Sequence, residues 1–140
     1  ADAGALIQQR YTESRMLLVD DEPINLEIAR LIMEGIGLRV DVAEDGLEAL
    51  QKADTTSYAF ILMDVQMPNM DGWQATAQIR ALPAHRTTPS LAMTANVFSE
   101  DKQRCTEVGM NDFIPQPFEP NQLFSILWKW LNRSANGTIG

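Results

Sequence analysis

The sequence predicts an α/β fold in which a five-stranded parallel sheet lies between two layers of helices. Short runs typical of strands alternate along the chain with longer runs whose apolar residues recur at helical spacing. The third strand-like run, residues 59–63, is apolar throughout, which is typical of a central strand covered on both faces. Because parallel strands are joined by right-handed crossovers, five such units form a three-layer α/β/α sandwich.

Each expected strand has its own pattern. The strands are expected at residues 16–19, 38–43, 59–63, 90–93 and 112–115. Residues 38–43 alternate apolar and polar side chains, so they suit an edge strand with one exposed face.

The first two helices follow the first two strands. The first begins at Pro23, a favourable first-turn residue, and ends at Gly35. Its apolar residues at helical spacing are expected to face the sheet, and they are Ile24, Ile28, Leu31 and Ile32. A shorter second helix near 47–53 is expected to turn Leu47 and Leu50 inward.

Two further helices are expected in the middle of the chain. One covers about 72–82, and the next runs from Ser99 as N-cap to Gly109 as the closing glycine. Between the first of these and the fourth strand, residues 83–89 are rich in helix breakers and predict a loop. We expect His85, the only histidine, to be a solvated residue of that loop rather than a phosphoacceptor.

The last helix opens at Pro120 and carries aromatic residues on two faces. Its apolar stripe consists of Leu123, Ile126, Leu127 and Trp130. Phe124 and Trp128 fall off this stripe, and a partly exposed aromatic pair can mark a surface for self-association or partner docking.

Composition excludes several classes of function. The 140 residues suffice for one domain, and the net charge of −8 without a basic stripe argues against nucleic-acid binding. No apolar stretch approaches the roughly 20 residues that span a bilayer, and residues 1–5 do not resemble a signal peptide, so we expect no membrane contact by this domain. The single cysteine, Cys105, fits a reducing compartment. We therefore expect a cytoplasmic location, whether or not the parent protein is anchored in a membrane.

Polar residues follow three of the expected strands. Asp20 and Asp21 end the first strand, Asp64 ends the third and Thr94 ends the fourth. The carboxyl ends of parallel strands share one edge of the sheet, where ligands bind. Hard carboxylate oxygens are the ligands that Mg²⁺ prefers, and it keeps its other positions for water and phosphate. The sequence therefore predicts a pocket for Mg²⁺ and a phosphoryl group.

With these residues the chain resembles the receiver domains of bacterial two-component response regulators. The motifs that carry the resemblance are Asp20-Asp21, Leu62-Met63-Asp64, Met67–Gly72, Met93–Asn96, Gly109–Phe113 and Pro117-Phe118. The residues of these motifs are most similar to those of the receiver domain at the C-terminal end of hybrid sensor histidine kinases. The resemblance implies the flavodoxin-like strand order 2-1-3-4-5. It also implies a receiver domain over 16–131, with 1–15 as a linker or helical lead-in and 132–140 as a flexible tail.

The resemblance also implies a role for each site residue. Asp64 would accept a phosphoryl group from a phosphohistidine on a histidine kinase domain or a histidine phosphotransfer protein. Asp21, Asp64 and the backbone carbonyl of Gln66 would hold Mg²⁺, with Asp20 acting largely through water. The hydroxyl of Thr94 would bond the transferred phosphoryl group, and Phe113 would move with it as a switch residue. Such a domain assists its own phosphorylation and dephosphorylation but is not an enzyme by itself.

Gln116 departs from the family pattern. Receivers place a lysine before the proline that follows the fifth strand, and this chain reads Pro115-Gln116-Pro117. A glutamine can donate a hydrogen bond to the phosphoryl site but carries no charge, and hydrogen bonds to neutral partners are weaker than charge-assisted ones.

Two other functions are compatible with parts of the sequence. A degenerate receiver would act mainly as a protein-docking module, which Gln116 favours and the intact acids oppose. A small enzyme or electron carrier on the same fold is opposed by two features: an acidic segment follows the first strand where a flavin carrier needs a phosphate loop, and Gln66 stands where a haloacid-type phosphatase needs a second acid.

Overall fold

The computed structural model describes residues 3–10, 14–64, 72–85, 88–94, 103, 106–115 and 119–137. Its strands are β1 (Arg15–Val19), β2 (Arg39–Ala43), β3 (Phe60–Asp64), β4 (Ser90–Thr94) and β5 (Asp112–Pro115). Its helices are α1 (Ala3–Arg10), α2 (Pro23–Gly35), α3 (Gly46–Thr55), α4 (Gly72–Arg80), the 3₁₀ turn η1 (Pro83–His85) and α6 (Pro120–Gly137). Most of the helix expected between Ser99 and Gly109 falls outside the described residues.

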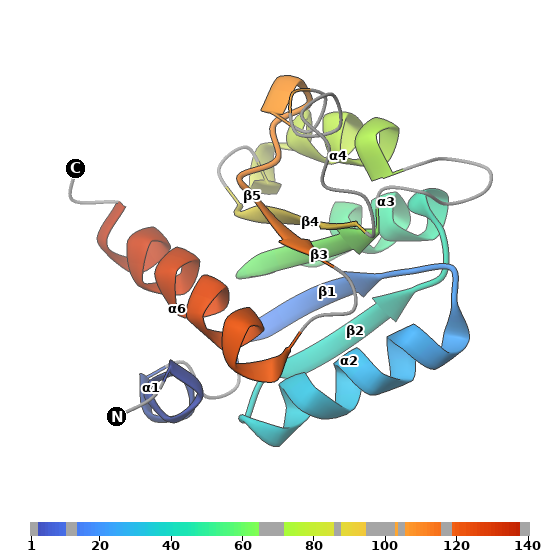
Figure 1. Cartoon of the computed structure of the whole chain (residues 1–140). Coiled ribbons are helices and arrows are strands. Elements are labelled where there is room, and N and C mark those ends of the chain that lie inside the picture. Colours follow the sequence, from blue (N-terminus) through green and yellow to red (C-terminus); the bar gives the residue numbers. More distant parts are fainter. Residues whose placement is uncertain are drawn as a thin grey trace.

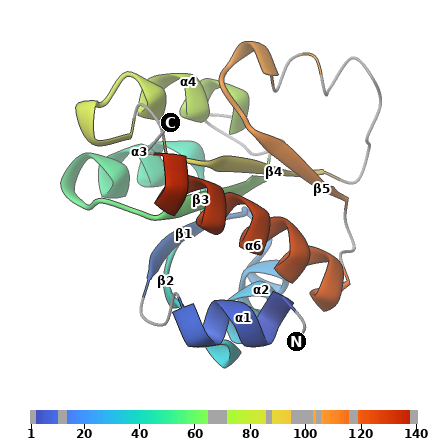
Figure 2. The same ribbon diagram turned by 90° about the vertical axis from the view of Figure 1, so that its left-hand side faces the viewer.

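The five strands form one parallel sheet in the order β2-β1-β3-β4-β5, which confirms the predicted fold class and strand order. Helices α3 and α4 cover one face, and α2 and α6 cover the other (Figures 1 and 2). The chain returns to the same end of the sheet after each crossover, so the carboxyl ends of all five strands share one edge.

Alternation along β1 builds both halves of the core. Met16 and Leu18 belong to the apolar cluster beneath α2 and α6, and Leu17 and Val19 belong to the cluster beneath α3 and α4. All four are fully buried, since a central parallel strand has helices on both sides. This explains why residues 16–19 of the strand are all apolar, rather than only every second one.

Helix α2 faces the sheet with a different side from the one predicted. Its buried residues are Leu26, Ala29 and Met33, and of the predicted set only Ile32 packs partly against the core. The other three, Ile24, Ile28 and Leu31, are 67%, 51% and 59% exposed. Both sets recur at helical spacing, so periodicity alone does not distinguish them. The predicted inward position of Leu47 on α3 is also wrong, because that side chain is 48% exposed.

His85 is a buried residue, not a solvated loop residue as predicted. It ends η1 and is fully buried. Its Nε2 lies 3.0 Å from the carbonyl oxygens of Ala53 and Thr56, and its Nδ1 lies 3.0 Å from the hydroxyl of Thr88. The last carbonyls of a helix have no partner within it, and the ring supplies one at the end of α3.

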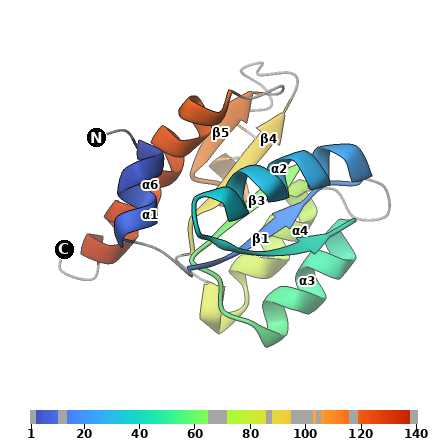
Figure 3. The ribbon, with the colours of Figure 1, turned by 90° about the horizontal axis from the view of Figure 1, so that it is seen from below.

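The two ends of the chain pack on each other. Helix α1 lies beside α6 (Figure 3), and its Ile7 is fully buried in the same cluster as Leu123, Leu127 and Leu131. Helix α6 continues to Gly137, past the end expected at Leu131. Within the described residues, none of the helices has the length and apolar character needed to cross a membrane.

Candidate functional site

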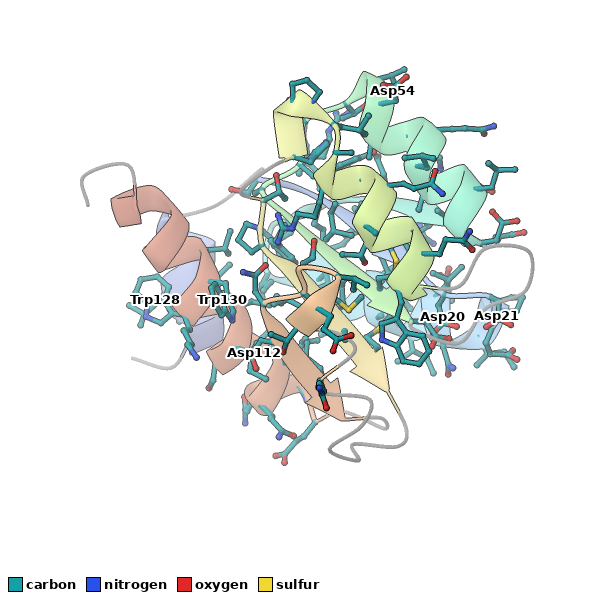
Figure 4. All side chains as sticks on the ribbon, turned by 90° about the horizontal axis from the view of Figure 1, so that it is seen from above. Asp20, Asp21, Asp54, Asp112, Trp128 and Trp130 are labelled. Carbon is teal, nitrogen blue, oxygen red and sulfur yellow. The ribbon has the colours of Figure 1, made fainter. Side chains whose placement is uncertain are left out.

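Three aspartates meet at the carboxyl edge of β1 and β3. The two strands pair in parallel with Val19 beside Met63, so Asp20 and Asp64 follow on neighbouring strands. One carboxylate oxygen from each of Asp20, Asp21 and Asp64 can be chosen so that all three lie within 4.8 Å of one another. Asp20 and Asp21 lie together at one end of the sheet, away from Asp54 and Asp112 (Figure 4). The structure thus brings together the three acids that the sequence analysis assigned to one site.

The three carboxylates differ in exposure. Asp20 is 1% exposed, Asp64 is half-buried and Asp21 is exposed. The backbone holds Asp20 in place: its N–H donates to the carbonyl of Ala43 at 3.2 Å, and its Oδ1 accepts from the N–H of Glu22 at 2.9 Å. Asp20 is therefore held in place within the cluster, whereas Asp21 is exposed to solvent.

This donor set fits Mg²⁺. Carboxylate oxygens about 2.1 Å from an octahedral ion lie roughly 3–4 Å from one another. The three carboxylate oxygens, which lie within 4.8 Å of one another, are close to that arrangement. Three acids held this close repel one another, and a bound divalent cation offsets the repulsion. Asp21 and Asp64 are the two members of the cluster that are not fully buried.

The other predicted site residues are described only in part. Asp64 pairs with Met93, and Thr94 pairs with Pro115, so the backbone of Thr94 lies at the same edge one strand away from Asp64. Phe113 lies within β5, while the side chains of Thr94 and Phe113 are outside the described part of the structure. Gln66 and Gln116 are also outside the described residues.

Helix α2, which follows the acids Asp20 and Asp21 in the chain, carries exposed apolar residues that the sequence analysis expected to be buried. We call the set Ile24, Ile28 and Leu31 the α2 surface; its helix begins two residues after Asp21. The signal was present in the sequence, because α2 carries more apolar residues at helical spacing than one buried stripe can hold. A contiguous exposed apolar patch on a soluble domain often marks a partner surface.

Comparisons with known proteins agree with this site. Residues 16–127 match the model of the response regulator receiver domain. The chain is 38% identical over 133 residues to the sensor protein GacS of Pseudomonas syringae pv. syringae, with 93% of this chain and 14% of the relative covered. It is 34% identical over 115 residues to the signal transduction histidine-protein kinase BarA of Shigella flexneri, with 82% and 12% covered. The chain therefore spans only a small part of these relatives.

Solved structures give the same result. The receiver domain of sensor histidine kinase PA1611 from Pseudomonas aeruginosa PAO1, which has a magnesium ion coordinated in its active-site cleft, is 36% identical. Its TM-score is 0.82, with 86% of this chain and 99% of that chain covered. The chemotaxis protein CheY4 of Vibrio cholerae is 30% identical with a TM-score of 0.82, over 84% and 98% of the two chains. The predicted resemblance is confirmed, and the chain belongs to the response regulator receiver domain family.

Proposed function

We propose that the chain accepts a phosphoryl group from a phosphohistidine onto Asp64 in a Mg²⁺-dependent phosphorelay. The observation that carries the proposal is the cluster of Asp20, Asp21 and Asp64 at the carboxyl edge of β1 and β3. Asp21, Asp64 and the carbonyl of Gln66 would hold Mg²⁺, and Asp20 would act largely through water. The ion would supply the positive charge that lets an anionic carboxylate approach an anionic phosphoryl group.

The reaction needs little covalent chemistry from the protein. A carboxylate oxygen of Asp64 bonds to phosphorus while the phosphorus–nitrogen bond of the phosphohistidine breaks. The electron pair of the broken bond returns to the imidazole, which takes up a proton. The hydroxyl of Thr94 and the amide of Gln116 then donate hydrogen bonds to the phosphoryl oxygens, and Phe113 responds to the movement of Thr94. Positioning of the reacting groups and neutralisation of their charge supply most of the rate enhancement.

The partner would be a histidine kinase domain or a histidine phosphotransfer protein that docks on the α2 surface. Ile24, Ile28 and Leu31 provide exposed apolar area beside the acid cluster. A phosphohistidine on a helix laid against α2 would reach Asp64 over a short distance. Phe124 and Trp128 pack partly against the core, so they offer less apolar surface than α2 does. Docking or self-association through that pair remains a prediction.

The domain would act as part of a larger signalling chain. We infer that the parent is a hybrid histidine kinase and that this domain works in the cytoplasm, because relatives such as GacS and BarA are sensor kinases. The isolated domain would turn over no external substrate; it would assist only the gain and loss of its own phosphate.

The decisive test is treatment with a small phosphodonor and Mg²⁺, followed by intact mass measurement. We expect a mass gain of one phosphoryl group that requires Mg²⁺ and disappears in Asp64→Asn. Asp54→Asn is the matched control, because Asp54 is an exposed carboxylate far from the cluster (Figure 4). Failure of the unmodified chain to gain mass would refute phosphoacceptance and favour the docking-only alternative.

A further inference from the structure

Strand β5 is the edge strand on which two of the predicted site residues depend. Among the described residues it pairs with β4 alone; it contains Phe113 and is followed in the sequence by Gln116. A four-residue edge strand has ladder hydrogen bonds on one side only, so its position depends on the contacts at its start. Those contacts therefore help to set where the backbone of β5 lies relative to β4.

Arg80, at the end of α4, reaches the start of β5. Its Nε and Nη2 donate to the carbonyl oxygen of Gly109 at 3.0 and 2.7 Å, and Nη2 also donates to Oδ1 of Asn111 at 2.6 Å. Its Nη1 donates to the carbonyl oxygens of His85, at 3.1 Å, and Thr88. One guanidinium thus joins α4 to the segment before β4 and to the segment before β5, which only the planar fork of an arginine can do.

Asn111 connects the hydrogen bonds of Arg80 to β4. Its Oδ1 also accepts from the N–H of Ser90 at 2.9 Å, and its own N–H donates to the carbonyl of Ser90 at 2.7 Å. Ser90 is the first residue of β4, and the parallel register that starts here places Thr94 opposite Pro115 at the other end. The contacts at the start of the two strands therefore set the register at the edge where the phosphoryl group would bind.

Gly109 leaves room for the guanidinium. Its φ of +98° lies in the left-handed region, which favours glycine. A Cβ at this position would lie 3.1 Å from Nε and 3.2 Å from Cγ of Arg80. The backbone conformation and the space needed by Arg80 thus both require glycine here.

We propose that Arg80 is a positioning residue that fixes the register of β5 against β4 and so places Phe113 and Gln116 at the phosphoryl-accepting edge. Its functional consequence rests on the proposed phosphoacceptor role of Asp64. The clustered acids Asp20, Asp21 and Asp64 lie at the carboxyl ends of β1 and β3, which Arg80 does not contact through any of these hydrogen bonds. Loss of the guanidinium hydrogen bonds should therefore slow phosphorylation and leave the Mg²⁺ affinity unchanged. General destabilisation would lower both the phosphorylation rate and the Mg²⁺ affinity.

The test compares Arg80→Lys with Arg39→Lys in the full chain. Lysine keeps the charge but loses the fork, and the control Arg39 is exposed at the start of β2, on the opposite edge of the sheet. Amide exchange by NMR, Mg²⁺ titration and phosphorylation by a small phosphodonor are measured on each variant. For Arg80→Lys we expect exchange of the Asn111 amide at least about tenfold faster, because two or more hydrogen bonds are lost. The Leu17 and Leu18 amides should be unchanged, the Mg²⁺ affinity should stay within about twofold, and phosphorylation should slow severalfold.

Three outcomes in Arg80→Lys would overturn the proposal. The amide exchange rate of Asn111 could be unchanged, or the Leu17 and Leu18 amides could exchange faster by the same factor as Asn111. The third is a normal phosphorylation rate although the Asn111 amide exchanges faster. Gly109→Ala provides a second test, since its Cβ would crowd the Arg80 side chain and strain the backbone at a positive φ, and it should show the same separation of phosphorylation from Mg²⁺ affinity. If the unmodified chain takes up no phosphate, the proposed function fails, and the exchange data still decide whether Arg80 fixes the strand.

Discussion

The indole Nε1–H of Trp130 donates a 2.9 Å hydrogen bond to Oδ2 of Asp112, the first residue of β5. The ammonium of Lys129 lies 3.5 Å from the same oxygen and 5.2 Å from the centroid of the Trp130 ring. Figure 4 shows Trp130 on α6 near Asp112. Arg80 approaches from α4, on the other face of the sheet, so helices from both layers hold the start of this edge strand.

Trp130→Phe should lower the free energy of unfolding by about 1–2 kcal/mol, because it removes a hydrogen bond to a partly exposed carboxylate and keeps most of the apolar contact. Urea unfolding gives the value. Trp128→Phe is the control, since it makes the same change of ring on the same helix and leaves the Asp112 contact in place; it should cost less. Equal losses in the two variants would show that ring size rather than the hydrogen bond matters.

Tyr58 should give the domain a stability that disappears at high pH. Burial, followed by the 2.8 Å hydrogen bond to Asp41 and the charge of that carboxylate, raises the pKa of Tyr58 to about 12. Since the unfolded pKa is about 10, the neutral phenol stabilises the fold fully below pH 10, and this contribution is lost as the pH rises through 12. Absorbance titration should show a late phenolate transition that Tyr58→Phe removes. A transition near pH 10 for Tyr58 would contradict the assignment.

His85→Ala should destabilise the domain by about 2–4 kcal/mol, because it leaves a cavity and removes the partners of the Ala53 and Thr56 carbonyls and of the Thr88 hydroxyl. Thr88→Val, which removes only the Nδ1 contact, should cost about 1 kcal/mol. Both values come from urea unfolding. If His85→Ala leaves the free energy of unfolding unchanged, the imidazole contacts contribute nothing net to stability.

The sequence predicted the sheet and its acids well because both depend on local patterns. The apolar run that forms β3 and the aspartates after β1 and β3 are visible in short windows, and the register Val19 to Met63 then follows from the parallel topology. Asp20, Asp21 and Asp64 could therefore be assigned to one site without a structure.

The predictions from sequence were wrong where tertiary contacts determine which side chains are buried. On α2, Ile28 and Met33 belong to two apolar stripes of equal spacing, and only packing on β1 and β2 selects the one that is buried. His85 lies among helix breakers, yet its ring meets the end of α3, far away in sequence. Arg80 gave no sequence signal, because four of the five hydrogen bonds described for its side chain go to backbone carbonyls, which any residue carries.

The exposure of Ile28 leads to a prediction about partner docking. Ile28→Ser should slow phosphotransfer from a phosphorylated histidine phosphotransfer protein several-fold, because apolar area is lost from the α2 surface. Phosphorylation by a small phosphodonor should not change, since that reaction needs no docking. Both rates are measured on the same preparation. Equal slowing with the two donors would locate the effect in the acid site and argue against docking on α2.

The last prediction concerns Gln116. Gln116→Lys should speed phosphorylation of Asp64 by about five- to thirtyfold, corresponding to roughly 1–2 kcal/mol, because an ammonium can meet both the carboxylate and the incoming phosphoryl oxygens. Phosphorylation is followed by intact mass at fixed phosphodonor and Mg²⁺ concentrations. Gln51→Lys is the matched control, since it adds the same charge at an exposed position of α3. A similar gain from Gln51→Lys would assign the effect to net charge. Unchanged rates in both variants would show that the neutral amide suffices, and that the departure from the family's lysine does not limit phosphoryl transfer in this chain.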